Sequence, residues 1–292
     1  MTKQGPHFDL HWLTKGFDPV SLDALNEKAE MLSRIDNKYV ITKASLANSL
    51  STLSAHFEIL EIKEQRAFTY DTRYFDDLQR SAYFEHHQGL RKGFKVRVRR
   101  YADAGLCSLE VKVKGGRGMT EKYRQPYDAT QLDALTPEAQ SFARATYHAQ
   151  YNKPFGYDFR PALDVRYLRI TLVAKAGGER MTIDTDLRFT NDHGTMPLGT
   201  GVFIVETKSA NGRGIADLHL RAIGERPTKR CSKYCIGMAA MGEVSRYNRF
   251  LPTMRKLGII AHSPAFGRWS EIRTDLWRDL SSHRSILATQ PV

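Results

Sequence analysis

Residues 92–101, KGFKVRVRRY, place Lys95, Arg97 and Arg99 at alternate positions with a valine in each gap. Because successive side chains of a β-strand point to opposite faces, this spacing predicts a strand whose valines pack one way and whose cations point the other. A basic strand face of this kind either meets solvent or lines a cavity that holds an anion. The rest of the chain decides between these two interpretations.

The same alternation of charged and apolar residues recurs in five other strand-like segments. Their charged faces carry Asp36 with Lys38, Glu110 with Lys112, Lys122 with Arg124, Arg180 with Asp184, and Glu206 with Lys208. One such strand is usually the solvent face of a sheet, but cations on many neighbouring strands would repel one another there. The pattern therefore predicts a closed or nearly closed sheet whose basic interior holds a multiply charged anion. In that interior, Glu110 and Glu206 are candidates to hold a divalent metal that bridges phosphate oxygens.

Strand-like and helix-like segments, separated by turn signals, run along most of the chain. The predicted strands are 34–41, 57–62, 66–75, 94–101, 105–114, 119–127, 160–174, 180–189 and 201–209. The predicted helices are 18–33, 43–55, 130–147, 213–223 and 231–248, with a peripheral helix in the tail after about residue 262. Helices that cover the outside of an antiparallel sheet make an α+β fold. Residues 211–214, NGRG, precede one helix, and we expect a plain cap there rather than an anion site.

The composition indicates an anionic partner. Lys and Arg number 44 against 32 Asp and Glu, a formal net charge of +12. No segment has the apolar core of a signal peptide or approaches the roughly 18 apolar residues of a membrane span, so we expect a soluble cytoplasmic protein without a membrane segment. The strand cations alternate with aliphatic residues, whereas a nucleic-acid binder would pair them with exposed aromatics, so no nucleic acid is expected as a partner. Cys107, Cys231 and Cys235 lack the partners of a zinc site and are expected to be buried free thiols.

An ordered set of short motifs gives the chain a family resemblance. The motifs are RIDNKYVI, YDTRYFD, GLRKGFKVRVRRY, LEVKVK, TEKYR, RMTIDTDLRF, VFIVETKS and RCSKYCIGM. In this order they resemble the VTC domain of polyphosphate polymerases, within the triphosphate tunnel metalloenzyme superfamily. The resemblance runs from about residue 30 to residue 250. It implies an N-terminal helical segment over 1–30, a tunnel domain over 31–250 and a peripheral tail over 251–292.

What the resemblance implies is an eight-stranded antiparallel β-barrel tunnel with flanking helices. The residues expected to act in catalysis are Lys38, Arg97, Arg99 and Glu206. The residues expected to bind substrate phosphates are Lys112, Lys122, Arg124, Arg169, Arg180, Lys208, Arg230 and Lys233, the last two at the spacing of the family's K-x-x-K helix motif. Glu206 would bind Mn²⁺ or Mg²⁺. The chain departs from the family in carrying Asp36 where a Glu is common.

The activity that the resemblance implies is transfer of the γ-phosphate of ATP to inorganic polyphosphate, with ADP as the second product. If water attacks instead, the same site is an inorganic triphosphatase or nucleoside triphosphatase. A polyphosphate-binding module without catalysis is the third alternative. Lys95, near the start of its strand, is expected at the tunnel mouth, and His86 and His87 are expected either there or in solvent.

Overall fold

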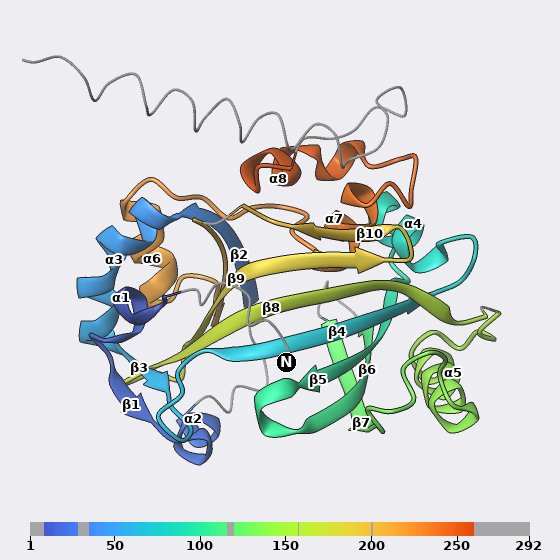
Figure 1. Cartoon of the computed structure of the whole chain (residues 1–292), viewed down its shortest axis with the longest axis horizontal. Helices are drawn as coiled ribbons and strands as arrows, with labels where there is room; N and C mark the ends of the chain where they lie inside the picture. Colours follow the sequence, from blue (N-terminus) through green and yellow to red (C-terminus); the bar gives the residue numbers. More distant parts are fainter. Residues whose placement is uncertain (1–8, 29–34, 116–119, 157, 200, 260–292) are drawn as a thin grey trace, which may run out of the picture. The chain divides into compact units, whose positions relative to one another are not determined.

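The computed structural model describes residues 9–28, 35–115, 120–156, 158–199 and 201–259 (Figure 1). The strands are β1 (Asp18–Val20), β2 (Ile35–Thr42), β3 (Phe57–Leu60), β4 (Phe68–Asp76), β5 (Phe94–Tyr101), β6 (Leu106–Lys114), β7 (Thr120–Pro126), β8 (Arg160–Ala174), β9 (Arg180–Asn191), β10 (Gly194–Pro197) and β11 (Val202–Ser209). The helices are α1 (His11–Thr14), α2 (Leu22–Lys28), α3 (Lys43–His56), α4 (Ser81–Gln88), α5 (Pro137–Tyr151), α6 (Ile215–Ala222), α7 (Lys233–Ala240) and α8 (Leu251–Lys256), with short 3₁₀ turns at Ala102–Ala104 and Asn248–Phe250. None of the helices in this part of the chain is long and apolar enough to cross a bilayer.

Eight strands pair side by side in the order β2-β11-β9-β8-β4-β5-β6-β7, and every neighbouring pair is antiparallel. The short strand β3 adds to β8 and pairs in parallel with β1, while β10 forms a hairpin with β9. Each segment predicted as a strand contains a strand. The predicted antiparallel α+β fold with flanking helices is therefore confirmed.

Of the two expected forms, closed or nearly closed, the sheet does not take the closed one, because β2 and β7 end the path and do not pair with each other in the described residues. The sheet nevertheless curls, since Lys112 on β6 lies close enough to Lys38 on β2 for their charges to interact. Both edge strands carry cations on the same face of the sheet as Lys112: Lys38 on β2, and Lys122 with Arg124 on β7. Like charges on adjacent strands disfavour pairing, which is a physical reason for an open seam.

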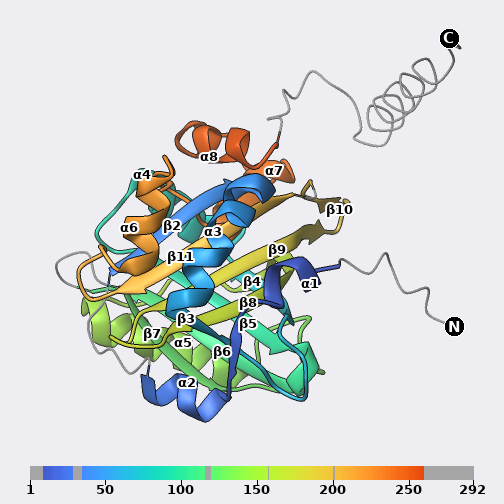
Figure 2. The same cartoon turned by 90° about the vertical axis from the view of Figure 1, so that its left-hand side faces the viewer.

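The face of the sheet opposite the cations packs against helices. One apolar cluster joins β2, β8, β9 and β11 to α1, α3 and α6, and Figure 2 shows α3 and α6 lying over these strands. A second cluster joins β4, β5 and β6 to α5. Val96 and Val98 are each 1% exposed in this second cluster, together with Ala139 and Ala143 of α5. The prediction that these valines face a covering helix is confirmed.

Several helix boundaries differ from the predictions. Asp18–Val20 is a strand rather than a helix start, and the helix begins after Ser21, whose hydroxyl accepts the Ala24 N–H. Pro19 is tolerated in β1 because it is a short edge strand. The helix predicted at 130–147 begins only at Pro137, after Thr136, whose hydroxyl accepts an N–H of the first turn.

The predicted helix at 231–248 is shorter, since α7 ends at Ala240. The short elements α4 and β10 were not predicted. The peripheral helix expected in the tail lies outside the described residues.

Two local features position the helices that flank the candidate site. The first N–H groups of α6, at Ile215 and Ala216, donate to the Glu179 carboxylate, so a side chain from outside the NGRG segment satisfies the start of this helix. On α7, a Cβ added at Gly237 would lie 2.5 Å from the Leu163 side chain and 2.7 Å from Phe189. Only glycine lets α7 approach β8 and β9 this closely, and α7 begins with Lys233.

Candidate functional site

The inner face is the face of the eight-stranded sheet that is opposite the helix-covered one. Ten cations of the described residues on this face are taken together: Lys38, Arg97, Arg99, Lys112, Lys122, Arg124, Arg169, Arg180, Lys208 and Lys233, the last contributed by α7 against β9. These are called the inner-face cations below. Glu110, Asp184 and Glu206 each lie within reach of two or more of these cations and organise them into groups.

Glu110 on β6 is the centre of the first group and is fully buried. Arg97 donates from Nε and Nη2 to its Oε2 at 2.7 and 2.5 Å. Arg99 lies 3.6 Å from the same oxygen, and Lys122 and Arg124 lie 3.7 and 3.6 Å from Oε1. Burial opposes ionisation of Glu110, but Arg97 and Arg99 outweigh it and hold the pKa of the carboxyl well below its ordinary value. Glu110 is therefore a fixed negative charge that holds four cations together.

Asp184 on β9 is the centre of the second group, on the strand next to β8. Arg169 donates from Nε and Nη2 to Oδ1 and Oδ2 at 2.6 and 2.7 Å, and Lys233 also contacts Oδ2. Burial raises the pKa of Asp184, but the charges of Arg169 and Lys233 lower it by more, so the pKa falls to about 2. The Arg169 guanidinium lies 5.0 Å from the Tyr70 ring, and the Lys233 ammonium lies 4.6 Å from the Tyr167 ring. Carboxylate and aromatic faces together fix both cations in place.

Glu206 on β11 is the centre of the third group. Lys38 and Lys208 make their closest contacts to its Oε1, at 3.1 and 2.5 Å. Burial opposes ionisation, but the two lysines, with Arg169 and Lys112, keep the pKa of Glu206 well below its ordinary value. Burial also lowers the pKa of Lys38, yet its carboxylate neighbours outweigh this and raise it, so Lys38 is charged at neutral pH.

Lys112 lies between the first and third groups. Burial, followed by repulsion from Arg97, lowers its pKa well below the ordinary lysine value, while Glu206 acts in the opposite direction. Its neighbour across β6 and β7 is Lys122, whose pKa burial lowers to about 8. Several positive charges therefore lie close together between β6 and β7, and a bound anion would reduce the repulsion between them.

The structure brings together every predicted phosphate binder except one. Arg180 lies opposite Lys208 in the β9–β11 ladder, on the same face. Arg230, in contrast, donates from Nη1 to the carbonyls of His86 and His87 at 3.2 and 3.3 Å. It therefore caps the C-terminus of α4 rather than joining any of the three acid-centred groups. Asp36 lies opposite Lys208 in the β2–β11 ladder, near Glu206.

Sequence reasoning missed the role of Asp184 and the tyrosines of the inner face. Tyr70 and Tyr74 on β4 lie under Arg169 and Arg97 respectively. Their alternation within YDTRYFD was a signal that they share one face, but only the register of β4 with β5 and β8 shows which cations they meet.

A divalent metal fits the inner face only if the substrate supplies most of the ligands. The described residues contain no group of three or more His, Cys, Asp or Glu side chains that could hold a metal ion. Mg²⁺ commonly takes one or two carboxylates and fills its other positions with phosphate oxygens and water. Glu206 suits this arrangement because Thr182, opposite it on β9, has a buried hydroxyl without a hydrogen-bond partner in the described structure. Glu110, inside four cations, is better suited to orient them than to bind a metal.

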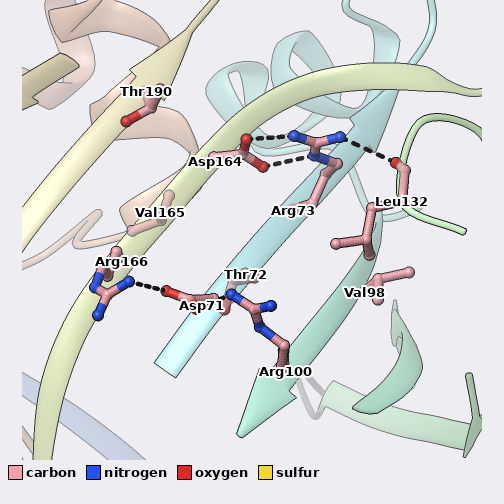
Figure 3. A pocket seen from close by; sticks show the side chains of 10 residues that line it. All are labelled: Asp71, Thr72, Arg73, Val98, Arg100, Leu132, Asp164, Val165, Arg166 and Thr190. Carbon is pink, nitrogen blue, oxygen red and sulfur yellow. Dashed lines mark hydrogen bonds and ion pairs between the residues drawn. The ribbon is translucent and has the colours of Figure 1, made fainter. Parts of the chain in front are cut away.

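A separate pocket of about 210 Å³ lies on the other face, against β4, β5, β8 and β9 (Figure 3). The arginines of this pocket are already paired. Arg73 forms a bidentate ion pair with Asp164, and Arg100 and Arg166 both contact Asp71. Figure 3 shows Arg73 beside Asp164 and Arg166 beside Asp71 among the residues that line the pocket. Because its cations are neutralised locally, this pocket is not the expected anion site.

Comparison with known proteins gives a family. The model of the VTC domain matches residues 33–242, which agrees with the resemblance seen from about 30 to 250. No curated protein matches the chain. Among solved structures, the PH1819 protein from Pyrococcus horikoshii OT3 is 12% identical, with 69% of this chain and 96% of that chain covered and a TM-score of 0.39. A protein from Hippeastrum, described by a dominant triphosphatase activity, is 13% identical, with 73% and 97% covered and a TM-score of 0.38.

The family match covers most of the chain, and it coincides with the strands that carry the inner-face cations. The eight-stranded antiparallel sheet with its basic inner face has the arrangement of a triphosphate tunnel, with a seam between β2 and β7. The chain belongs to the VTC domain family of the triphosphate tunnel metalloenzyme superfamily.

Proposed function

We propose that this protein is a polyphosphate polymerase, which transfers the γ-phosphate of ATP to the end of an inorganic polyphosphate chain. Membership of the family supports an enzyme that acts on a triphosphate or a polyphosphate. The single observation that carries the proposal is the inner face, where many more cations than acids converge and where Glu110, Asp184 and Glu206 are each already held by two or more cations. The surplus of positive charge calls for a ligand with several negative charges.

The arrangement suits phosphoryl transfer. The transition state of this reaction is loose and spreads charge over the equatorial oxygens, so positioning and electrostatic stabilisation supply most of the catalysis. Arg97 and Arg99 present guanidinium groups that Glu110 orients in advance, which reduces the reorganisation needed when the phosphoryl group develops charge. A Mn²⁺ or Mg²⁺ ion at Glu206 would neutralise charge on the phosphate oxygens. No nucleophilic side chain is needed, because the terminal phosphate of the chain attacks.

Lys38 pairs with Glu206, and Lys112 is near enough to Glu206 for their charges to interact, so both lysines complete the site. Lys38 is a charged donor fixed by Glu206, so it is placed to hold a phosphate oxygen beside the metal position. The low pKa of Lys112 reflects burial and then repulsion from Arg97, and the arrival of phosphate would favour the charged form of this lysine. ADP leaves, and the chain grows by one phosphate.

The direct test is to incubate the protein with ATP and Mn²⁺ and to follow both polyphosphate on a gel and free phosphate. Polyphosphate that lengthens with time, with equal release of ADP, is the expected result. Free phosphate without polymer contradicts the polymerase and identifies a triphosphatase. Tight binding of polyphosphate without turnover of ATP contradicts both enzymes and identifies a binding module.

A further inference from the structure

A second group of cations lies where α4 meets β5, β6 and the start of α7. It consists of Lys95, Lys114 and Arg230, arranged around the His86 ring, and is called the α4 cluster below. We propose that Lys95 and Lys114 of the α4 cluster bind the acceptor polyphosphate chain, beyond the phosphates held by the inner-face cations. This inference rests on the proposed function, and its ligand class is a linear phosphate chain longer than a triphosphate.

The cations of the α4 cluster have neutral acceptors where the inner-face cations have carboxylates. Lys95 Nζ lies 3.1 Å from Ser232 Oγ and 3.3 Å from His86 Nδ1. Lys114 Nζ donates to the Leu90 carbonyl at 2.6 Å. Such acceptors orient an ammonium group but leave its charge uncompensated, and that charge remains available to an anion.

The lowered pKa of His86 shows how strongly the nearby cations act at this position. Its ring stacks on Phe250 with an interplanar angle of 3°, which fixes it beside Lys95. Repulsion from Lys95, then burial, then Lys114 and Arg230 lower the pKa of His86 to about 2. His86 is therefore neutral and accepts from Lys95. Glu85 is a nearby acid, and its charge partly offsets the repulsion at Lys114.

The register of β5 and β6 connects the α4 cluster to the main site. Lys95 lies directly opposite Lys112, and the next pair on the same face is Arg97 with Glu110. Residues two apart on a strand are separated by roughly 7 Å, so the cations form a continuous row from Arg99 to Lys95. Side chains of the α4 cluster are half-buried, so the row ends where solvent can reach it.

The chemistry of transfer requires a place for the acceptor. A hydrolase must hold one triphosphate and a water molecule, whereas a polymerase must also hold a second anionic chain in line with the bond that breaks. The α4 cluster supplies positive charge at one end of the row that holds the triphosphate. It is thus the part of the molecule that distinguishes the two reactions.

The test compares binding of inorganic tripolyphosphate with binding of a longer linear polyphosphate, by calorimetry and without ATP. The variant is Lys95→Met with Lys114→Met, which removes two charges and retains much of the side-chain volume. The control is Lys15→Met with Lys175→Met, two exposed lysines that belong neither to the inner-face cations nor to the α4 cluster. A second variant, Lys95→Arg with Lys114→Arg, keeps the charge.

We expect the wild type to bind the longer chain more tightly than tripolyphosphate. In the methionine variant, the ratio of the affinity for the longer chain to the affinity for tripolyphosphate should fall by at least about tenfold, while the affinity for tripolyphosphate itself stays unchanged. The arginine variant and the surface control should behave like the wild type. In the activity assay, added polyphosphate should stimulate ATP consumption by the wild type but not by the methionine variant.

An equal loss of affinity for both ligands would assign the lysines to the triphosphate site and overturn the proposal. If the methionine variant still binds the longer chain more tightly than tripolyphosphate by the same factor as the wild type, the proposal is also overturned. Because the calorimetry needs no turnover, a wild type that makes no polymer would contradict the polymerase alone. The binding result would still decide whether the α4 cluster holds a chain.

Discussion

The Arg169 guanidinium on β8 forms a two-pronged ion pair with the Asp184 carboxylate on β9, with N···O distances of 2.6 and 2.7 Å. Asp184 is fully buried, and its second cation, Lys233, comes from α7. One carboxylate therefore connects two strands and a helix. Removing it would leave two cations without their shared partner.

The first prediction concerns this carboxylate. Asp184→Asn should lower the free energy of unfolding by about 3–5 kcal/mol, because it breaks a buried pair and leaves charges uncompensated. Urea denaturation measures this difference. Asp158→Asn is the matched control, since Asp158 pairs with Arg160 on the surface and should contribute less than about 1 kcal/mol. Equal effects of the two substitutions would show that Asp184 does not hold its cations together.

The second prediction concerns pH. The pKa of Lys122 is lowered to about 8, chiefly by burial, so in the free protein this side chain loses its positive charge as pH rises through 8. Phosphate binding favours the charged form. KM for ATP should therefore rise between pH 7 and pH 9, and binding should take up a proton. Lys122→Arg keeps the charge over this range and should flatten the profile; an unchanged profile in that variant would assign the effect to another group.

The third prediction concerns the metal position. Glu206→Gln should reduce metal-dependent turnover by about 100-fold or more, because an amide replaces the carboxylate expected to hold the ion. EDTA should abolish turnover by the wild type, and Mn²⁺ or Mg²⁺ should restore it. Glu27→Gln, at an exposed position on α2, is the control and should retain full activity. Full activity of Glu206→Gln would remove Glu206 from the site.

The fourth prediction separates shape from charge at Arg97. Arg97→Lys keeps the positive charge but loses the second donor to Glu110, so kcat/KM should fall by about 10- to 100-fold with little change in the fold. Steady-state kinetics and the circular dichroism spectrum measure the two quantities. Arg160→Lys, on the surface, is the control. If Arg97→Lys has wild-type kinetics, a point charge is sufficient at this position.

The fifth prediction tests the approach of α7 to the sheet. Gly237→Ala should cost about 1–3 kcal/mol in unfolding free energy, because the added methyl group would overlap Leu163 and Phe189. The helix would shift, and with it Lys233, so activity should also fall. Gly156→Ala is the control, since a Cβ there meets no atom within 4 Å. Unchanged stability of Gly237→Ala would show that the contact relaxes freely.

The sequence by itself determined which residues share a face. Alternation in each strand is a local property with a period of two, so the positions of Arg97, Arg99 and Val96 relative to the core followed from KVRVR alone. The ordered motifs were sufficient to indicate the family and the limits of the matched region. The starts of helices were harder to predict, because capping by Thr136 and pairing of Asp18–Val20 with β3 outweighed helical spacing.

Only the tertiary structure decided which acid meets which cation. Arg230 and Lys233 are three residues apart, yet one caps α4 and the other contacts Asp184. The curl of the sheet and the packing of helices against it also decide two other features. These are the open seam between β2 and β7 and the position of the α4 cluster. The physical reason is that charge interactions depend on distances between residues far apart in the chain, and strand register and helix packing set those distances.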